Sequence, residues 1–78
     1  MNNKFDLQIK LGELHEKNGD INRSLECFKS AYDMAVLLED KKYQVDALIK
    51  ITEGYFYKGE VEVSIKYAQI VEELLKNL

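Results

Sequence analysis

The stretch Leu11–Ala31, LGELHEKNGDINRSLECFKSA, decides the fold because it joins two helical patterns through one short turn. Gly19 and Asp20 stand at its centre. Glycine adopts the left-handed backbone that ends a helix, and an acid after it accepts hydrogen bonds from the free amides that begin the next helix. The stretch is therefore predicted to form a helical hairpin.

The same pattern returns after 40 residues in Ile51–Val71, ITEGYFYKGEVEVSIKYAQIV. Aligning Phe5–Leu38 with Val45–Leu78 gives seven identical pairs among 34, where about two are expected by chance. The identical pairs are Asp6/Asp46, Ile9/Ile49, Lys10/Lys50, Glu13/Glu53, Gly19/Gly59, Ser24/Ser64 and Leu38/Leu78. A duplicated helix pair is the unit of an α-solenoid, in which each hairpin stacks on the next.

The whole chain fits four helices, with a third boundary at a polar run in which Asp40 is the expected cap. Apolar residues recur at spacings of three and four, as in the stripe of Leu7, Leu11 and Leu14. The expected helices are Asn3–Asn18, Ile21–Glu39, Lys42–Lys58 and Val61–Asn77. We predict an all-α fold in a single domain over residues 1–78, built from two antiparallel helix-turn-helix repeats over about 3–39 and 42–78.

Small side chains at Gly12 and Ser24, and at the matching Thr52 and Ser64, are expected where two helices cross closely. Bulky side chains should then fill the seam between the two hairpins. The residues expected in that seam are Phe28, Tyr32, Ile51 and Tyr55.

Composition excludes several classes of protein. A chain of 78 residues allows one domain, and its single cysteine, Cys27, excludes an internal disulfide. The net charge of −3 disfavours a general nucleic-acid binder. No apolar run approaches the roughly 20 residues of a membrane span, and the N-terminal residues lack the apolar core of an export signal. A lone thiol without an export signal favours a cytoplasmic protein.

Residues for catalysis are sparse. His15 is the only histidine, and Cys27 lies on another expected helix, so packing is the alternative to a Cys–His nucleophile pair. His15-Glu16 begins like a zinc-protease motif, but Gly19 stands where the second histidine is required. We expect no enzymatic activity, no metal and no cofactor.

The two repeats resemble the tetratricopeptide repeat (TPR) family, in which an aliphatic and a small residue, an aromatic, a turn glycine, small residues and an aromatic recur in this order. The second copy departs at Thr52, where glycine is usual, and at Ala68, where an aromatic is usual. The closing proline is absent, and the period of 40 exceeds the usual 34, as in the extended repeats of some bacterial regulators. A plain antiparallel four-helix bundle is the alternative.

The resemblance implies a small adaptor or assembly protein that binds a peptide or helix of a partner on the surface made by the first helix of each repeat. It maps that surface onto Asp6, Ile9, Glu13, Glu16, Lys17, Asp46, Ile49, Glu53, Phe56 and Tyr57. Acidic walls with apolar spots favour a partner that carries Lys or Arg and large apolar side chains. The alternative is that the acids form a solvated face and that Phe56 and Tyr57 cover a helix end.

The last expected helix carries more apolar residues than one buried stripe needs. One side holds Val61, Ile65, Ala68 and Leu75, and the other holds Val63, Tyr67, Ile70 and Leu74. One side can cover the preceding hairpin, and the other would be an exposed patch typical of an interface. We expect a homodimer through Val63, Tyr67, Ile70, Leu74 and Leu78. The alternative function is a purely structural, self-assembling four-helix bundle with no separate ligand.

Overall fold

Four α-helices make up nearly all of residues 3–78, the part of the chain that the computed structural model describes. They are α1 (Asn3–Lys17), α2 (Ile21–Leu37), α3 (Lys41–Tyr57) and α4 (Val61–Lys76). No strand occurs among these residues. The all-α prediction is confirmed, and each helix ends within two residues of its expected boundary. None of the helices in the described part combines the length and apolar character needed to cross a membrane.

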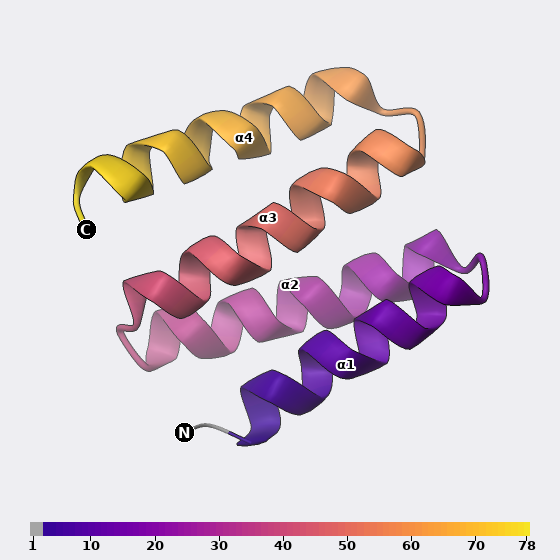
Figure 1. Cartoon of the computed structure of the whole chain (residues 1–78), viewed down its shortest axis with the longest axis horizontal. Helices are drawn as coiled ribbons and strands as arrows, with labels where there is room; N and C mark the ends of the chain where they lie inside the picture. The colour runs from indigo at the N-terminus through magenta and orange to yellow at the C-terminus, as the bar shows by residue number, and fades with distance from the viewer. Residues whose placement is uncertain (1–2) are drawn as a thin grey trace.

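The helices form an open row in chain order, with α2 set behind α1 and α3 so that these two also touch through side chains (Figure 1). α1 packs against α2, α2 against α3, and α3 against α4, with successive helices running in opposite directions. The resulting slab measures 32 × 29 × 14 Å. α1 and α4 lie at opposite edges of it, whereas a closed four-helix bundle would bring them together. The row therefore has two outer edges that no helix of residues 3–78 covers.

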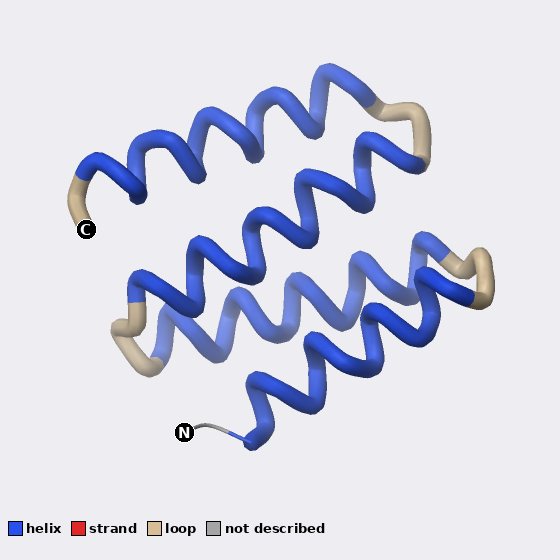
Figure 2. Tube along the Cα trace, in the orientation of Figure 1, coloured by secondary structure: helices blue, strands red, loops and turns tan. Residues whose placement is uncertain are grey.

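The three turns of the chain, drawn in tan in Figure 2, share one geometry. Each contains a residue with left-handed backbone: Gly19 (φ 81°), Glu39 (φ 55°) and Gly59 (φ 89°). In the first turn the amide of Gly19 donates to the carbonyl of Glu16 (3.0 Å) and that of Asp20 to the carbonyl of His15 (2.8 Å). The other two turns repeat both bonds. This Schellman arrangement satisfies the last carbonyls of each helix and reverses the chain.

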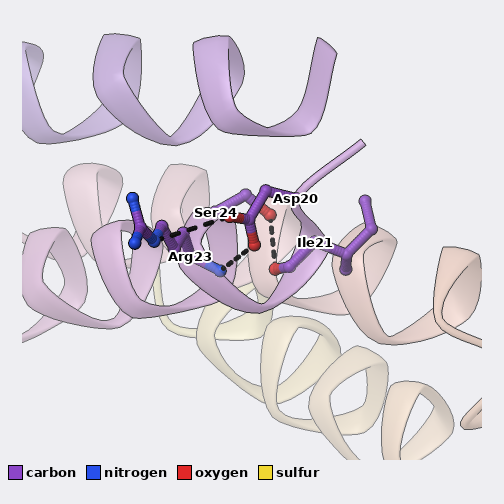
Figure 3. Close-up of polar contacts among 4 residues, drawn as sticks. All are labelled: Asp20, Ile21, Arg23 and Ser24. Atoms are coloured by element: carbon purple, nitrogen blue, oxygen red, sulfur yellow. Dashed lines mark hydrogen bonds and ion pairs between the residues drawn. The ribbon is translucent and has the colours of Figure 1, made fainter. Parts of the chain in front are cut away.

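Side-chain caps begin the helices after these turns. Asp20 Oδ1 accepts a hydrogen bond from the amide of Arg23 at 3.1 Å, and Asp40 Oδ1 accepts one from the amide of Tyr43 at 3.0 Å. The Arg23 guanidinium also lies 3.5 Å from the Asp20 carboxylate (Figure 3). Glu60 stands at the third such position and makes no side-chain cap, because its longer side chain does not fold back as aspartate does.

The core lies in the seam between the two hairpins. Phe28, Leu48 and Ile51 are fully buried there, and Tyr32 and Tyr55 pack against them half-buried. The expected seam is thus confirmed. A side chain at Gly12 would overlap the Phe28 ring, so this glycine lets α1 and α2 approach.

Buried serines mark the same point of each hairpin. Ser24 Oγ donates to the carbonyl of Ile21 and Ser64 Oγ to that of Val61, both at 2.7 Å. Figure 3 shows the first of these bonds. Because each hydroxyl is satisfied within its own helix, a small polar residue can be buried at the crossing.

The two outer helices, α1 and α4, expose apolar side chains that the sequence pattern placed in the core. α1 buries Phe5 and Gly12, and its stripe of Leu7, Leu11 and Leu14 faces outward, 57%, 37% and 55% exposed. This stripe indicated the helix correctly but does not face the core, because no helix lies beyond α1.

The structure shows which side chains of α4 face the other helices and which face outward. Val63, Tyr67 and Leu74 are half-buried, and Tyr67 and Leu74 pack against the core. Of the residues expected to mediate self-association, only Ile70 and Leu78 are exposed. The uncovered stripe of α4 consists instead of Val61, Ile65 and Leu75, about half exposed. The pattern alone could not tell which of the two sides meets α3.

Candidate functional site

A groove of about 480 Å³ lies between α1 and α3. Its lining residues are Phe5, Asp6, Ile9, Lys10, Glu13, Tyr43, Asp46, Ile49 and Lys50. These belong to the first helix of each hairpin, which the family resemblance assigns to an inner surface. The groove is therefore a property of the stacked pair of hairpins and not of either hairpin alone.

Two contacts hold α1 and α3 side by side along the groove. The rings of Phe5 and Tyr43 stack with centroids 4.3 Å apart and planes 5° from parallel. Two turns further on, the Lys50 ammonium lies 2.9 Å from Glu13 Oε2. The aromatic stack and the ion pair together set the spacing of the two groove walls.

The ion pair keeps both of its partners charged. The hydrogen bond from Lys50 lowers the pKa of Glu13 below its ordinary value, and burial opposes this effect. The same bond raises the pKa of Lys50, again against burial. Both shifts favour the charged form of the side chain, so the pair is intact across the neutral range.

The groove is lined by most of what the two repeats share. Four of the seven identical pairs form the pattern Asp-x-x-Ile-Lys-x-x-Glu, at residues 6–13 and 46–53. Seven of these eight side chains line the groove, and Glu53 lines a smaller hollow beside α4. The glycine and serine pairs are explained by the turns and the crossings, whereas Asp6, Lys10 and Asp46 are exposed. Burial in the core therefore does not explain why both repeats carry these residue types.

The structure brings together half of the residues that the family resemblance assigned to the inner surface. Asp6, Ile9, Glu13, Asp46 and Ile49 line the groove. Phe56 and Tyr57 lie at the far end of α3, exposed, with their rings in an edge contact at 6.1 Å. Lys17 is exposed at the end of α1.

Glu16 lies outside the groove lining but close to its charged pair. One oxygen of this carboxylate, Oε2, is buried and accepts no hydrogen bond from residues 3–78. The carboxylate also acts electrostatically on Lys50. Glu16 therefore adds negative potential behind the wall of the groove.

Four lining residues were missed by sequence reasoning: Phe5, Lys10, Tyr43 and Lys50. The repeat alignment already contained a signal for the two lysines, because they form an identical pair. Phe5 and Tyr43 occupy different register positions in their helices, so their contact needed the tertiary structure.

The remaining chemistry-bearing groups do not form a reactive site. Burial, and next the charge of Glu26, raise the pKa of the Cys27 thiol, which is opposite to the shift that activates a nucleophilic cysteine. Within residues 3–78 no three His, Cys, Asp or Glu side chains gather as a metal site would require.

No protein-family model matches the chain, and comparisons with curated proteins and with solved structures likewise find no match.

Proposed function

We propose that this chain is a protein-interaction module of the TPR kind, which binds a peptide or helix of a partner protein in the groove between α1 and α3. One observation carries the proposal. The pattern Asp-x-x-Ile-Lys-x-x-Glu is retained in both repeats at positions that line one groove, several of them exposed. Identical residues at equivalent exposed positions of one groove support a binding role for this surface.

The groove combines apolar contact with a small excess of negative charge. Ile9 and Ile49 supply aliphatic surface, and Ile49 is 42% exposed. Glu13 is neutralised by Lys50, which leaves Asp6, Asp46 and Lys10 without an ion pair among the described residues. A partner with apolar anchors and a basic side chain fits this lining best.

The duplication also constrains the spacing of a ligand that crosses both helices. Side chains of α1 and α3 meet across the groove, so the two helix axes lie on the order of 10 Å apart. A peptide in the polyproline II conformation advances about 3.1 Å per residue and presents the same face every three residues. Two equivalent subsites on α1 and α3 thus accept like side chains about three residues apart. We expect a partner segment in which apolar and basic residues recur with that spacing.

Fluorescence anisotropy with labelled peptides tests the proposal. One peptide repeats Leu and Lys every three residues, a second replaces Lys by Glu, and a third replaces Leu by Ser. We expect saturable binding of the first alone. Ile49→Asp should weaken it about tenfold or more, and the double variant Asp6→Lys/Asp46→Lys should favour the acidic peptide. The matched control is Asn22→Asp, exposed on α2, which should bind as the parent chain does.

Absence of saturable binding by all three peptides, or equal loss in the Asn22→Asp control, would contradict the groove as a peptide site. Circular dichroism of each variant separates lost binding from lost folding.

A further inference from the structure

The two outer edges of the helix row are both apolar. We call Leu7, Leu11 and Leu14 on α1 the head face, and Val61, Ile65 and Leu75 on α4 the tail face. Each of these side chains is between 37% and 57% exposed. Contiguous apolar surface of this kind usually marks an interface.

The internal repeat indicates which kind of surface each face can pack against. The head-face positions correspond, 40 residues on, to Ala47, Ile51 and Gly54, which α3 buries in its seam with α2. The tail-face positions correspond to Ile21, Leu25 and Ala35, which α2 turns to the core and seam. Head and tail are thus the two halves of a seam that the molecule already forms once.

We propose that copies of this chain stack head to tail, with α4 of one copy packed against α1 of the next in the register of the α2–α3 seam. Two contacts define that register. Leu25 Cδ2 lies 2.6 Å from where a Cβ of Gly54 would be, and Gln44 Nε2 lies 3.4 Å from the carbonyl oxygen of Ala35. The shift of 40 residues sets Ile65 against Leu14 of the next copy. Because Leu25 leaves no room for a Cβ at Gly54, α4 and the next α1 must lie farther apart than α2 and α3.

The apolar volumes of the two faces differ from those of the inner seam. The head face has Leu14 in place of Gly54 and Leu7 in place of Ala47, so it is bulkier than the inner seam. The tail hairpin has Ala68 in place of Phe28, and beside Ala68 lies a hollow of about 170 Å³ between α3 and α4. The hollow offers space beside Ala68, and Leu14 is accommodated by the wider spacing of α4 and the next α1, because close packing admits no overlap.

The charges of the two ends are complementary. Inside the molecule Glu13 of the first repeat pairs with Lys50 of the second. Moving both partners on by one repeat of 40 residues turns this pair into Glu53 and Lys10 of the next copy. Neither Lys10 nor Glu53 forms an ion pair within residues 3–78. Each end thus carries one half of an ion pair that the inner seam completes.

Two further polar contacts of the inner seam have matched donors and acceptors across the stack. The bond from Lys29 Nζ to Tyr55 Oη (2.6 Å) becomes one between Gln69 and His15. The bond from Gln44 to the Ala35 carbonyl becomes one from Lys4 to the carbonyl of Leu75, in the last turn of α4. A cation at a helix C-terminus is favourable.

Stacking of this kind joins unlike surfaces, so it does not close on itself as a two-fold dimer does. It also places Glu53, in the smaller hollow of one copy, beside Lys10 in the groove of the next copy. This mode differs from the homodimer through α4 that the sequence pattern favoured.

Two single variants distinguish head-to-tail stacking from a symmetric dimer. Leu14→Glu blocks the head and Ile65→Glu blocks the tail, and both positions are about half exposed, so the fold should persist by circular dichroism. By sedimentation velocity the parent chain should grow beyond a dimer as its concentration is raised. Each variant alone should remain at 9.1 kDa. An equimolar mixture should form a heterodimer and nothing larger, because one intact head meets one intact tail.

A parent chain that stays monomeric at every concentration up to millimolar would overturn the proposal. So would a Leu14→Glu variant that dimerises as well as the parent while the mixture does not associate, because that result indicates a two-fold contact through α4.

A charge exchange gives an independent test. Lys10→Glu and Glu53→Lys should each weaken association several-fold, and both changes in one chain should restore it to within about threefold of the parent. Equal, additive losses in the double variant would contradict the predicted pair.

Discussion

The two hairpins share a backbone design and differ in how their helices cross. Each has a left-handed glycine in its turn and a buried serine four residues after an acid. At the crossing of α1 and α2 the fully buried Phe28 ring rests on Gly12. The equivalent pair in the second hairpin is Ala68 and Thr52, which leave a small hollow. The turn chemistry alone therefore suffices for a hairpin, and the crossing decides how tightly it is packed.

The second hairpin is held by aromatic contacts near its turn. The rings of Tyr55 and Tyr67 stack at 5.4 Å, where the first hairpin has His15 and Cys27. The Lys29 ammonium lies 5.1 Å from the centroid of the Tyr55 ring, and so ties α2 to this stack. The two hairpins therefore reach the same helix pairing through different side chains, and their stabilities should respond to different substitutions.

The largest effect is expected at the tight crossing. Phe28→Ala removes a fully buried ring and should lower the free energy of unfolding by about 3–5 kcal/mol. Urea denaturation followed by circular dichroism measures it. Phe56→Ala, at a 60% exposed ring, is the control and should change stability by less than about 0.5 kcal/mol. Similar losses in both variants would show that the core is not centred on Phe28.

The next effect concerns the small residues at the two crossings. Gly12→Ala improves helix propensity but drives a methyl group into the Phe28 ring, so we expect a net loss of about 1–3 kcal/mol. Thr52→Ala removes only a side chain that bonds to its own helix at the Leu48 carbonyl. It should be close to neutral in the same denaturation experiment. A stabilised Gly12→Ala variant would show that the ring is free to move.

The helix caps at the two hairpin turns differ, and the difference should have a smaller effect on stability. Asp20→Ala removes a hydrogen bond to the amide of Arg23 and should cost about 1 kcal/mol. Glu60→Ala removes no side-chain cap and should cost only a few tenths. Thermal melts of the two variants measure the difference, and equal shifts would contradict it.

The middle turn differs from both hairpin turns because Glu39, rather than glycine, has left-handed backbone. Such a conformation strains a residue that has a Cβ atom. Glu39→Gly should therefore stabilise the chain by about 0.5–1 kcal/mol, net of glycine's greater freedom in the unfolded chain. Gly19→Ala, which places a Cβ at φ 81°, should shift the melting temperature in the opposite direction.

The smallest effect is the pH dependence of the ion pair that joins the hairpins. Because Lys50 lowers the pKa of Glu13 in the folded chain, the pair stabilises the fold above the ordinary glutamate pKa of 4.5. That contribution is lost as the pH falls through the lower, folded-state pKa.

Lys50 shows the opposite sign, because its raised pKa contributes below 10.5 and is lost at higher pH. At this partly exposed pair the contribution should be less than about 1 kcal/mol. Glu13→Gln should flatten the acid limb of a plot of stability against pH, and an unchanged limb would assign it to other carboxylates.

Much of the site could be read from the repeat, and the reason is geometric. The family resemblance assigned Asp6, Ile9 and Glu13 to this surface. Positions that share a face of one helix share a face of its copy, and Asp46 and Ile49 accordingly line the same groove. Phe56 and Tyr57 could not be placed in the same way, because three consecutive aromatics follow no helical face and only the path of α3 decides where they lie.

The amino-acid sequence by itself determined four helices, their ends and their pairing into two like hairpins, because left-handed glycines, acidic caps and apolar spacing act within a few residues. Only the tertiary structure decided which apolar stripe is buried. Leu11 and Ile51 occupy the same place in their repeats, yet Ile51 is 1% exposed and Leu11 37%. Burial depends on whether another helix lies alongside, and that is a property of the row and not of the residue.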